Sequence, residues 1–250
     1  MEGDLPYLRI ATFNEHTTEN LLEGVADLRE AAGGELPGLI LDLRSNPGGL
    51  LEQSVSVSDV FLDGGEVVST RGRDPRETKR YNARPGDALD GAPIVILINA
   101  GTASAAEIVT GALKDRGRAT VIGSTSFGKG SMQTVIPLRG GRDGALRLTT
   151  ARYYTPAGTS IQATGIEPDI AIAARRRDPE DDRPSRFTEA NLRNALTNED
   201  GVEREDPEPE QLEQPPEDWP EDEDYVLHRA KELLSEAITP RQAALSDNQG

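Results

Sequence analysis

Cysteine is absent from the 250-residue chain, and histidine occurs only twice, as His16 and His228. The lack of cysteine excludes disulfides, thiol nucleophiles and cysteine-ligated metals. No group of His, Asp and Glu has metal-ligand spacing, so we expect neither a metal nor another cofactor. Neither histidine lies beside an expected strand end of the core, which argues against a Ser-His-Asp triad.

Long apolar runs are missing as well, and none approaches the roughly 18 residues that a membrane-spanning helix needs. Met1 is followed by acidic residues instead of a basic and then an apolar stretch, so we expect no signal peptide at this start. Most of the net charge of −17 falls between Asn198 and Asp224, where 14 acidic residues accompany one basic residue. No basic face balances it, which argues against nucleic-acid binding.

Lysine is scarce: four lysines stand against 23 arginines. Arginine keeps its proton in proteins, whereas a buried lysine can lose it. Lys129 follows Phe127 and lies between Gly128 and Gly130, which favours a packed position of low dielectric. A free lysine has a pKa of about 10.4, so a lysine that acts as a base needs a drop of roughly 3 units, which desolvation can supply. The alternative is an exposed lysine at a hairpin tip.

Apolar patterning predicts an α/β core over residues 5–173. Predicted strands cover 7–13, 38–43, 66–70, 93–98, 119–123, 132–137 and 146–154, and predicted helices cover 17–32, 50–61 and 104–115. Strand–helix–strand repetition implies βαβ crossover units. Residues 73–90 are polar, contain Pro and Gly, and are expected to form a loop.

The remaining residues are expected to extend this core at its C-terminal end. Residues 174–197 read as an exposed linker with a short helix at 187–197. Residues 198–224 are acidic and proline-rich, and we expect disorder because they have little apolar surface to bury. They act as a solvated linker or, alternatively, as a partner-docking or self-regulatory tail. Residues 225–250 are expected to form an amphipathic helix and a tail, packed on the core or on a neighbour.

Ser104 is the candidate nucleophile because it stands where a buried strand turns into a helix. Its neighbours Gly101, Ala103 and Ala105 are small and allow a substrate backbone to approach. The free N–H groups of a helix start, Ala105 among them, can stabilise a developing oxyanion. The alternative is that Ser104 only caps the helix.

With histidine excluded, Lys129 is the better base for Ser104. Gln133 lies four residues further on an expected strand, and an even offset places both side chains on one face. Its neutral amide can orient the lysine amine without restoring a positive charge. The alternative is a solvent-facing strand residue.

Two further positions can support such chemistry. Glycines in the loop Asn46-Pro47-Gly48-Gly49 allow backbone N–H groups to face a ligand, so Gly48 or Gly49 can supply a second oxyanion donor. A phosphate site is the weaker alternative there, since the loop lacks the P-loop pattern. Asp115, at the helix end, is interpreted as structural and held by a neighbour such as Arg116 or Arg118.

Five stretches of the core resemble the C-terminal processing peptidases, also called tail-specific proteases. They are Tyr7–Asn14, Gly38–Leu51 (GLILDLRSNPGGLL), Gly101–Ala119 (GTASAAEIVTGALKDRGRA), Ile122–Gln133 (IGSTSFGKGSMQ) and Leu148–Ile170 (LTTARYYTPAGTSIQATGIEPDI). They follow in family order and spacing over most of residues 5–172. The resemblance implies a ClpP/crotonase-like core and a serine endopeptidase that cleaves proteins near their C-termini.

The same resemblance implies roles for single residues. Ser104 is the nucleophile, Lys129 the general base and Gln133 the orienting third member. The oxyanion hole is formed by backbone N–H groups of Ala105 and the loop with Gly48 and Gly49. Asp115 falls where the family often has Asp.

Further expectations concern surroundings and partners. The family acts in the bacterial periplasm or cell envelope, or in the chloroplast lumen, on substrate C-termini. Its PDZ domain, which normally precedes Tyr7, is absent from this chain. A homo-oligomer or an adaptor protein is left open as a partner. The alternatives to a protease are a non-catalytic binding module on the same fold, inactive for lack of the PDZ domain, and a crotonase-type acyl-CoA enzyme.

Overall fold

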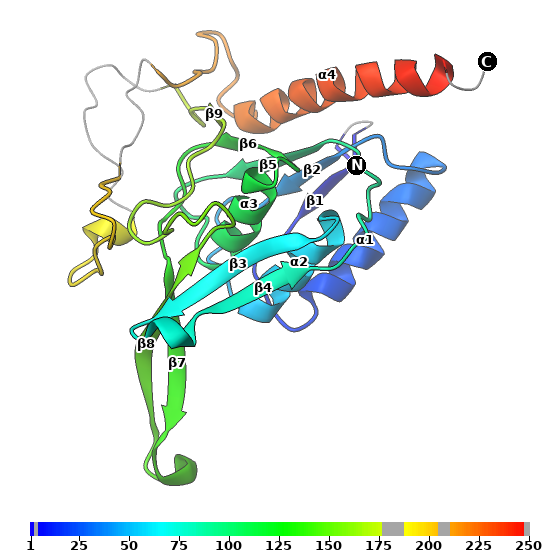
Figure 1. The fold of residues 1–250 in the computed structure, drawn as a ribbon. Helices are drawn as coiled ribbons and strands as arrows, with labels where there is room; N and C mark the ends of the chain where they lie inside the picture. The colour runs from blue at the N-terminus through cyan, green and yellow to red at the C-terminus, as the bar shows by residue number, and fades with distance from the viewer. Residues whose placement is uncertain (3–4, 177–187, 205–210, 248–250) are drawn as a thin grey trace.

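A computed structural model describes residues 1–2, 5–176, 188–204 and 211–247 (Figure 1). Two β-sheets organise these residues. The parallel sheet has the order β1 (Tyr7–Arg9), β2 (Leu39–Asp42), β5 (Ile94–Ile98), β6 (Thr120–Gly123) and β9 (Ile170–Ala171). The antiparallel sheet has the order β4 (Lys79–Ala83), β3 (Gly65–Gly72), β8 (Ala145–Tyr154) and β7 (Ser131–Pro137).

Helices cover the parallel sheet on both faces (Figure 1). They are α1 (Thr17–Ala32), α2 (Leu51–Phe61), α3 (Ala105–Asp115) and α4 (Tyr225–Asp247). In β5, Ile94, Ile96 and Ile98 face the core that contains α1, α2 and α3, whereas Val95 and Leu97 face a second cluster built with α4. Side chains alternate along a strand, so this nearly continuous apolar run contributes buried side chains to the clusters on both faces of the sheet.

The second cluster fixes α4 on the sheet. Its helix side chains include Val226, Ala230 and Leu234, which pack with Ile40 of β2 and Ile122 of β6. Full burial of an aliphatic side chain contributes roughly 1.5–3 kcal/mol relative to exposure. This packing stabilises the C-terminal helix against the core.

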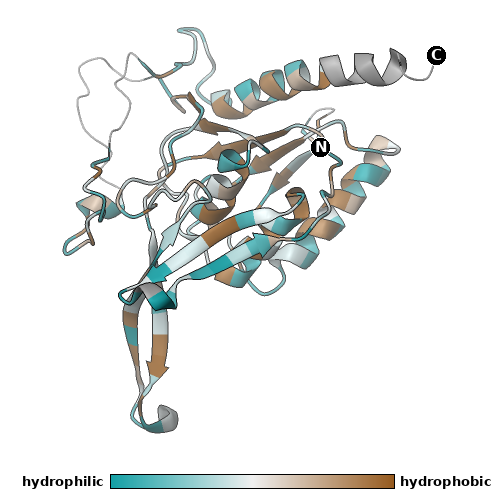
Figure 2. Ribbon diagram, in the orientation of Figure 1, coloured by the Kyte–Doolittle hydropathy of each residue, from teal (hydrophilic) through white to brown (hydrophobic). Residues whose placement is uncertain are grey.

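Strands β7 and β8 project from the body as a two-stranded arm (Figure 1). Figure 2 shows apolar residues along it. Val135, Ile136, Leu146 and Leu148 are all exposed there. Ile136 pairs with Leu146 across the two strands, so the arm carries apolar cross-strand contacts outside the main core.

Most expected elements of the core are present with shifted ends, and two strands, β4 and β9, were missed. The strand expected at 7–13 ends at Arg9, and the loop expected at 73–90 contains β4 and a 3-10 turn, Pro75–Glu77. Strand β4 reads Lys-Arg-Tyr-Asn-Ala and buries only Ala83, so it lacks the apolar alternation of a half-buried strand. The two-residue β9 is likewise too short to give a pattern.

One expectation for the C-terminal region was wrong within the described residues. The helix expected at 187–197 is a single 3-10 turn, Glu189–Asn191, and residue 187 lies outside the described residues. Residues 198–204 and 211–224 are irregular and mostly exposed, while 205–210 lie outside the described residues, so the disorder expected over 198–224 stays a prediction. Two contacts join this segment to the body: the Glu213 N–H donates to the Ala171 carbonyl and the Glu213 carbonyl accepts from the Ala173 N–H, both at 2.9 Å, and Trp219 packs on the second cluster.

No helix among the described residues combines the length and apolar character needed to cross a bilayer.

Candidate active site

Three loops meet at the carboxyl ends of β2, β5 and β6, the edge where open α/β sheets usually bind ligands. Backbone hydrogen bonds join them. The N–H of Ala103 donates to the carbonyl of Asn46 at 2.8 Å, and the N–H of Phe127 donates to the carbonyl of Thr102 at 2.9 Å. The segments that carry Gly48, Ser104 and Lys129 therefore form one surface.

Ser104 is the N-cap residue of α3 and has a backbone conformation that helix capping does not require. Its φ and ψ are 55° and −115°, whereas an ordinary N-cap residue has extended backbone angles. Ser104 and Glu107 form a capping box, in which the Ser104 N–H donates to Glu107 Oε2 at 2.7 Å. The capping role proposed as an alternative is thus present. Strained backbone at a strand-to-helix turn is in addition typical of functional sites.

Glycines bring the Asn46–Gly49 loop against this turn. A Cβ atom on Gly48, whose φ is +94°, would lie 2.7 Å from Ser104 Cβ and 2.8 Å from the Ala105 nitrogen. The Gly48 N–H, however, donates to the Asn46 side chain at 2.8 Å. The N–H groups of Gly49 and Ala105 have no acceptor among the described residues. In this conformation those two are the available oxyanion donors.

The segment of Lys129 packs tightly on the loop after β8. A Cβ on Gly130 would lie 2.3 Å from the backbone nitrogen of Gln162, and one on Gly128 would lie 3.1 Å from the Ala163 carbonyl carbon. Only glycine permits these approaches. Lys129 is half-buried between two buried glycines, so it is not the exposed hairpin-tip lysine of the alternative interpretation.

Glu107 ties the serine and the lysine together, and it was missed in the sequence. Its side chain is fully buried. Oε2 accepts from the backbone N–H of Ser104 at 2.7 Å and of Lys129 at 2.9 Å. Oε1 accepts from the Ser126 hydroxyl at 2.5 Å and from the Gly128 N–H at 2.7 Å. The signal that could have revealed it is the Ser-x-x-Glu capping-box spacing at residues 104–107.

Two effects compete at the Glu107 carboxyl. Burial raises its pKa to about 7 because the charged form loses its hydration. The four hydrogen-bond donors oppose this rise, since each favours the carboxylate. Burial is the larger effect.

Gln133 does not follow the regular strand on which its expected position depended. Strand β7 begins only at Ser131, and its pairing with β8 shifts register between Met132 and Gln133. A bulge of this kind redirects the side chains that follow it. Gln133 is exposed, and among the described residues it has no hydrogen bond to Lys129. Its role as third member remains a prediction.

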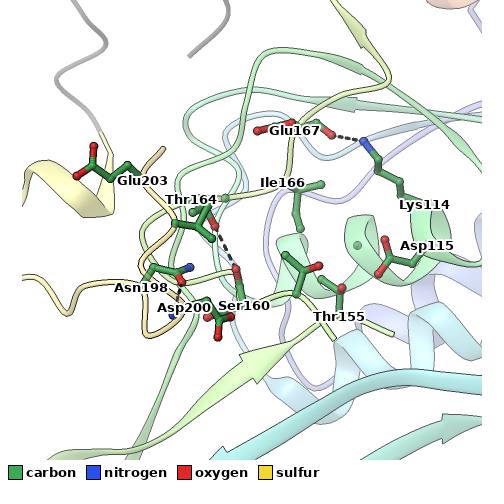
Figure 3. A pocket seen from close by; sticks show the side chains of 14 residues that line it. Lys114, Asp115, Thr155, Ser160, Thr164, Ile166, Glu167, Asn198, Asp200 and Glu203 are labelled. Carbon is green, nitrogen blue, oxygen red and sulfur yellow. Dashed lines mark hydrogen bonds between the residues drawn. The ribbon is translucent and has the colours of Figure 1, made fainter. Parts of the chain in front are cut away.

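Asp115 lies at the opposite end of α3 from Ser104, about 16 Å along the helix axis. It accepts the backbone N–H of Ala157 at 2.9 Å. The partner expected among neighbouring arginines was therefore wrong: Arg118 pairs with Asp87 instead. Figure 3 shows Asp115 at the wall of a cavity of about 300 Å³, whose lining residues do not include Ser104 or Lys129. The contacts support a structural role for Asp115.

The two histidines lie in other parts of the molecule. His16 is exposed and faces Glu19, and His228 packs against Trp219 beside Glu232. Within the described residues, no group of three or more His, Cys, Asp or Glu side chains could hold a metal ion.

The fold and the site define a hydrolase-type α/β core with a strained serine beside a glycine-flanked lysine. The chain belongs to peptidase family S41, which its residues 4–172 match. It is 56% identical over 173 residues to the carboxy-terminal-processing protease of Bartonella bacilliformis, covering 69% of this chain and 39% of that protein. It is 39% identical over 169 residues to the chloroplastic C-terminal processing peptidase of Tetradesmus obliquus, covering 67% and 35%.

A solved structure agrees with this assignment. The photosystem II D1 C-terminal processing protease matches with a TM-score of 0.59 at 39% identity, over 66% of this chain and 42% of that chain. The expected fold class is thereby confirmed. The chain spans well under half the length of these relatives.

Proposed function

We propose that the protein is a serine endopeptidase that uses Ser104 as nucleophile and Lys129 as general base. One observation carries this proposal. The backbones of the strained serine and of the glycine-flanked lysine donate to the same oxygen of buried Glu107, at 2.7 and 2.9 Å. Nucleophilic catalysis by serine needs a base held in register with it, and this shared acceptor provides that register.

The reaction follows from these groups. Lys129 Nζ takes the proton of Ser104 Oγ as the oxygen bonds to the peptide carbonyl carbon. The protonated lysine then gives that proton to the leaving amine as the C–N bond breaks, which leaves an ester on Ser104. Water, deprotonated by Lys129, attacks the ester, and the carboxylate product leaves as Ser104 regains a proton.

Backbone N–H groups stabilise the tetrahedral oxyanion. Ala105 and Gly49 are the donors proposed for this role, with Gly48 shaping the close approach of the loop. Fixed donors of this kind typically supply 10²–10³-fold in rate. Gln133 is retained as the proposed third member that orients the lysine amine.

The substrates proposed are protein C-termini, and the proposed location is the bacterial cell envelope. The names of the relatives, which include carboxy-terminal-processing proteases of a bacterium and of a chloroplast, support the substrate class, whereas the location rests on the resemblance to the family. A homo-oligomer or an adaptor protein is proposed as a partner.

Hydrolysis of β-casein by three purified variants tests the mechanism. Ser104→Ala and Lys129→Ala should each lose activity while keeping the wild-type circular dichroism spectrum. Lys129→Arg should also be inactive, because arginine keeps the charge but does not release its proton. Full activity of Lys129→Ala would overturn the assignment of the base.

A fluorophosphonate probe tests the nucleophile independently of substrate choice. The wild-type protein should be labelled at Ser104, and Ser104→Ala should not be labelled. Exposed serines elsewhere, such as Ser235, serve as internal controls for unspecific reaction. A folded wild-type sample that takes no label would favour a non-catalytic binding module.

A further inference from the structure

Residues 188–204, called the strap below, cross the surface beside the lysine segment. They lie beyond residues 4–172 that match the peptidase family. The strap contains one 3-10 turn and is otherwise irregular. Its position therefore depends on the contacts that it makes with the core.

The strap hydrogen-bonds to three consecutive carbonyl groups, which are separated from Lys129 only by Gly128. Arg204 donates from Nη1 to the Ser126 carbonyl at 2.5 Å and from Nη2 to the Thr125 carbonyl at 3.2 Å. The Glu189 N–H donates to the Phe127 carbonyl at 3.0 Å. The two-pronged guanidinium suits adjacent carbonyls better than a single-point donor would.

The opposite side of the same segment is held by the core. The Phe127 N–H donates to the Thr102 carbonyl, and the N–H groups of Gly128 and Lys129 donate to Glu107. Ser126 joins both sides, because its hydroxyl donates to Glu107 while its carbonyl accepts from the strap. The segment is thus fixed by N–H groups on the core side and by carbonyl groups on the strap side.

The strap is also attached directly behind Gly130. Gln162 is fully buried. Its side-chain Nε2 donates to the Leu196 backbone carbonyl at 2.9 Å, and its own backbone carbonyl accepts from Asn198 Nδ2 at 3.0 Å. A Cβ on Gly130 would meet the backbone of this same Gln162. Loosening the strap here would loosen the surface on which the lysine segment rests.

Two side chains of β8 hold the strap between these points. Arg152 donates to the Thr197 carbonyl at 2.6 Å and forms an ion pair with Glu199. Glu199 also accepts from the Tyr154 hydroxyl. The strap therefore contacts the arm, the loop after β8 and the lysine segment.

We infer that the strap is a positioning element for Lys129 and that Arg204 is its main anchoring residue. The inference rests on the proposed function of Lys129 as the base. It assigns part of the catalytic geometry to a segment outside the family match. Displacement of catalytic groups by about 1 Å can cost 10²-fold in rate, so partial loosening is expected to cost about tenfold.

The test compares full-length Arg204→Ala and Arg204→Lys with Arg193→Ala as the matched control. Arg193 lies in the same strap and is exposed. Hydrolysis of fluorescein-labelled casein gives kcat and KM, and hydrogen–deuterium exchange follows the amides of Gly128 and Lys129. Asn198→Ala removes a different contact of the strap and replaces Arg204→Ala if that variant does not fold.

The expected result is a kcat about tenfold lower for Arg204→Ala, with KM and melting temperature unchanged and with faster exchange at Gly128 and Lys129. Arg204→Lys should fall in between, and Arg193→Ala should match the wild type. Unchanged exchange, an unchanged kcat, or a rise in KM alone would overturn the inference. If the wild type hydrolyses no casein, the proposed function fails by itself, and the exchange measurement still decides whether the strap holds the segment.

Discussion

Replacing Glu107 by Gln tests whether burial or hydrogen bonding dominates the pKa of the carboxyl group that contacts both the serine and the lysine segments. Glu107 is fully buried, and its pKa is raised from 4.5 to about 7. Each pKa unit corresponds to 1.36 kcal/mol, so the shift amounts to about 3 kcal/mol. Because the pKa of Glu107 is raised in the folded state, this carboxyl contributes its full stabilisation of the folded protein below pH 4.5. That contribution is lost as the pH rises through about 7.

The assay is urea unfolding of wild type and Glu107→Gln at several pH values between 4.5 and 8. Across this range the free energy of unfolding of the wild type should fall by about 3 kcal/mol more than that of the variant. Titration of all other groups is common to both proteins and cancels in the difference. Thr110→Val is a matched control, since Thr110 is buried on the same helix and donates only to the Ala106 carbonyl.

Parallel pH dependences of wild type and Glu107→Gln would refute the reasoning. That result would mean that the four donors keep the carboxylate ionised throughout, and that hydrogen bonding outweighs burial. A glutamine also places an NH₂ group against two donors, so the variant should be less stable than the wild type at low pH by roughly 1–3 kcal/mol.

Three further substitutions test separate parts of the structure. Gly48→Ala should lower kcat roughly 10²-fold in the casein assay and also lower the melting temperature, because the new Cβ would lie 2.8 Å from the Ala105 nitrogen at a φ of +94°; an unchanged kcat would contradict the proximity of this loop to the site. Asp115→Ala should cost about 1 kcal/mol in urea unfolding, through loss of the bond to Ala157, and keep kcat; loss of activity in the folded variant would show a catalytic role. Leu234→Ala should cost about 2–5 kcal/mol, since this side chain is fully buried; a cost below 1 kcal/mol would mean that α4 contributes little to folding.

The sequence predicted the parallel core well because its strands are nearly continuous apolar runs. In β5 both faces are buried, and such a run has few alternative structures. Strand β4 could not be found in this way, because its residues are mostly exposed and its stability comes from pairing with β3. Pairing partners are set by tertiary structure, which local patterns do not encode.

The candidate site was predicted only where local sequence features mark its residues, and not where tertiary contacts define them. Ser104 and Lys129 stand out through their small neighbours, which are local features of the sequence. Glu107 reads as an ordinary acidic residue in the first turn of a helix, and its importance comes from donors about 20 positions away. The position of Gln133 was expected from strand periodicity, and one irregular residue step in β7 removes that basis.

The packing of α4 shows that the hydrophobic core extends beyond the residues that match the peptidase family. The family match ends at residue 172, yet Ile40, Val95, Leu97 and Ile122 have their outer face covered by residues from Tyr225 onward. A fragment cut at the similarity boundary would expose this apolar sheet face to water, and such surfaces promote aggregation. Expression boundaries for this chain should therefore extend through residue 238 at least, whatever length its relatives share with it.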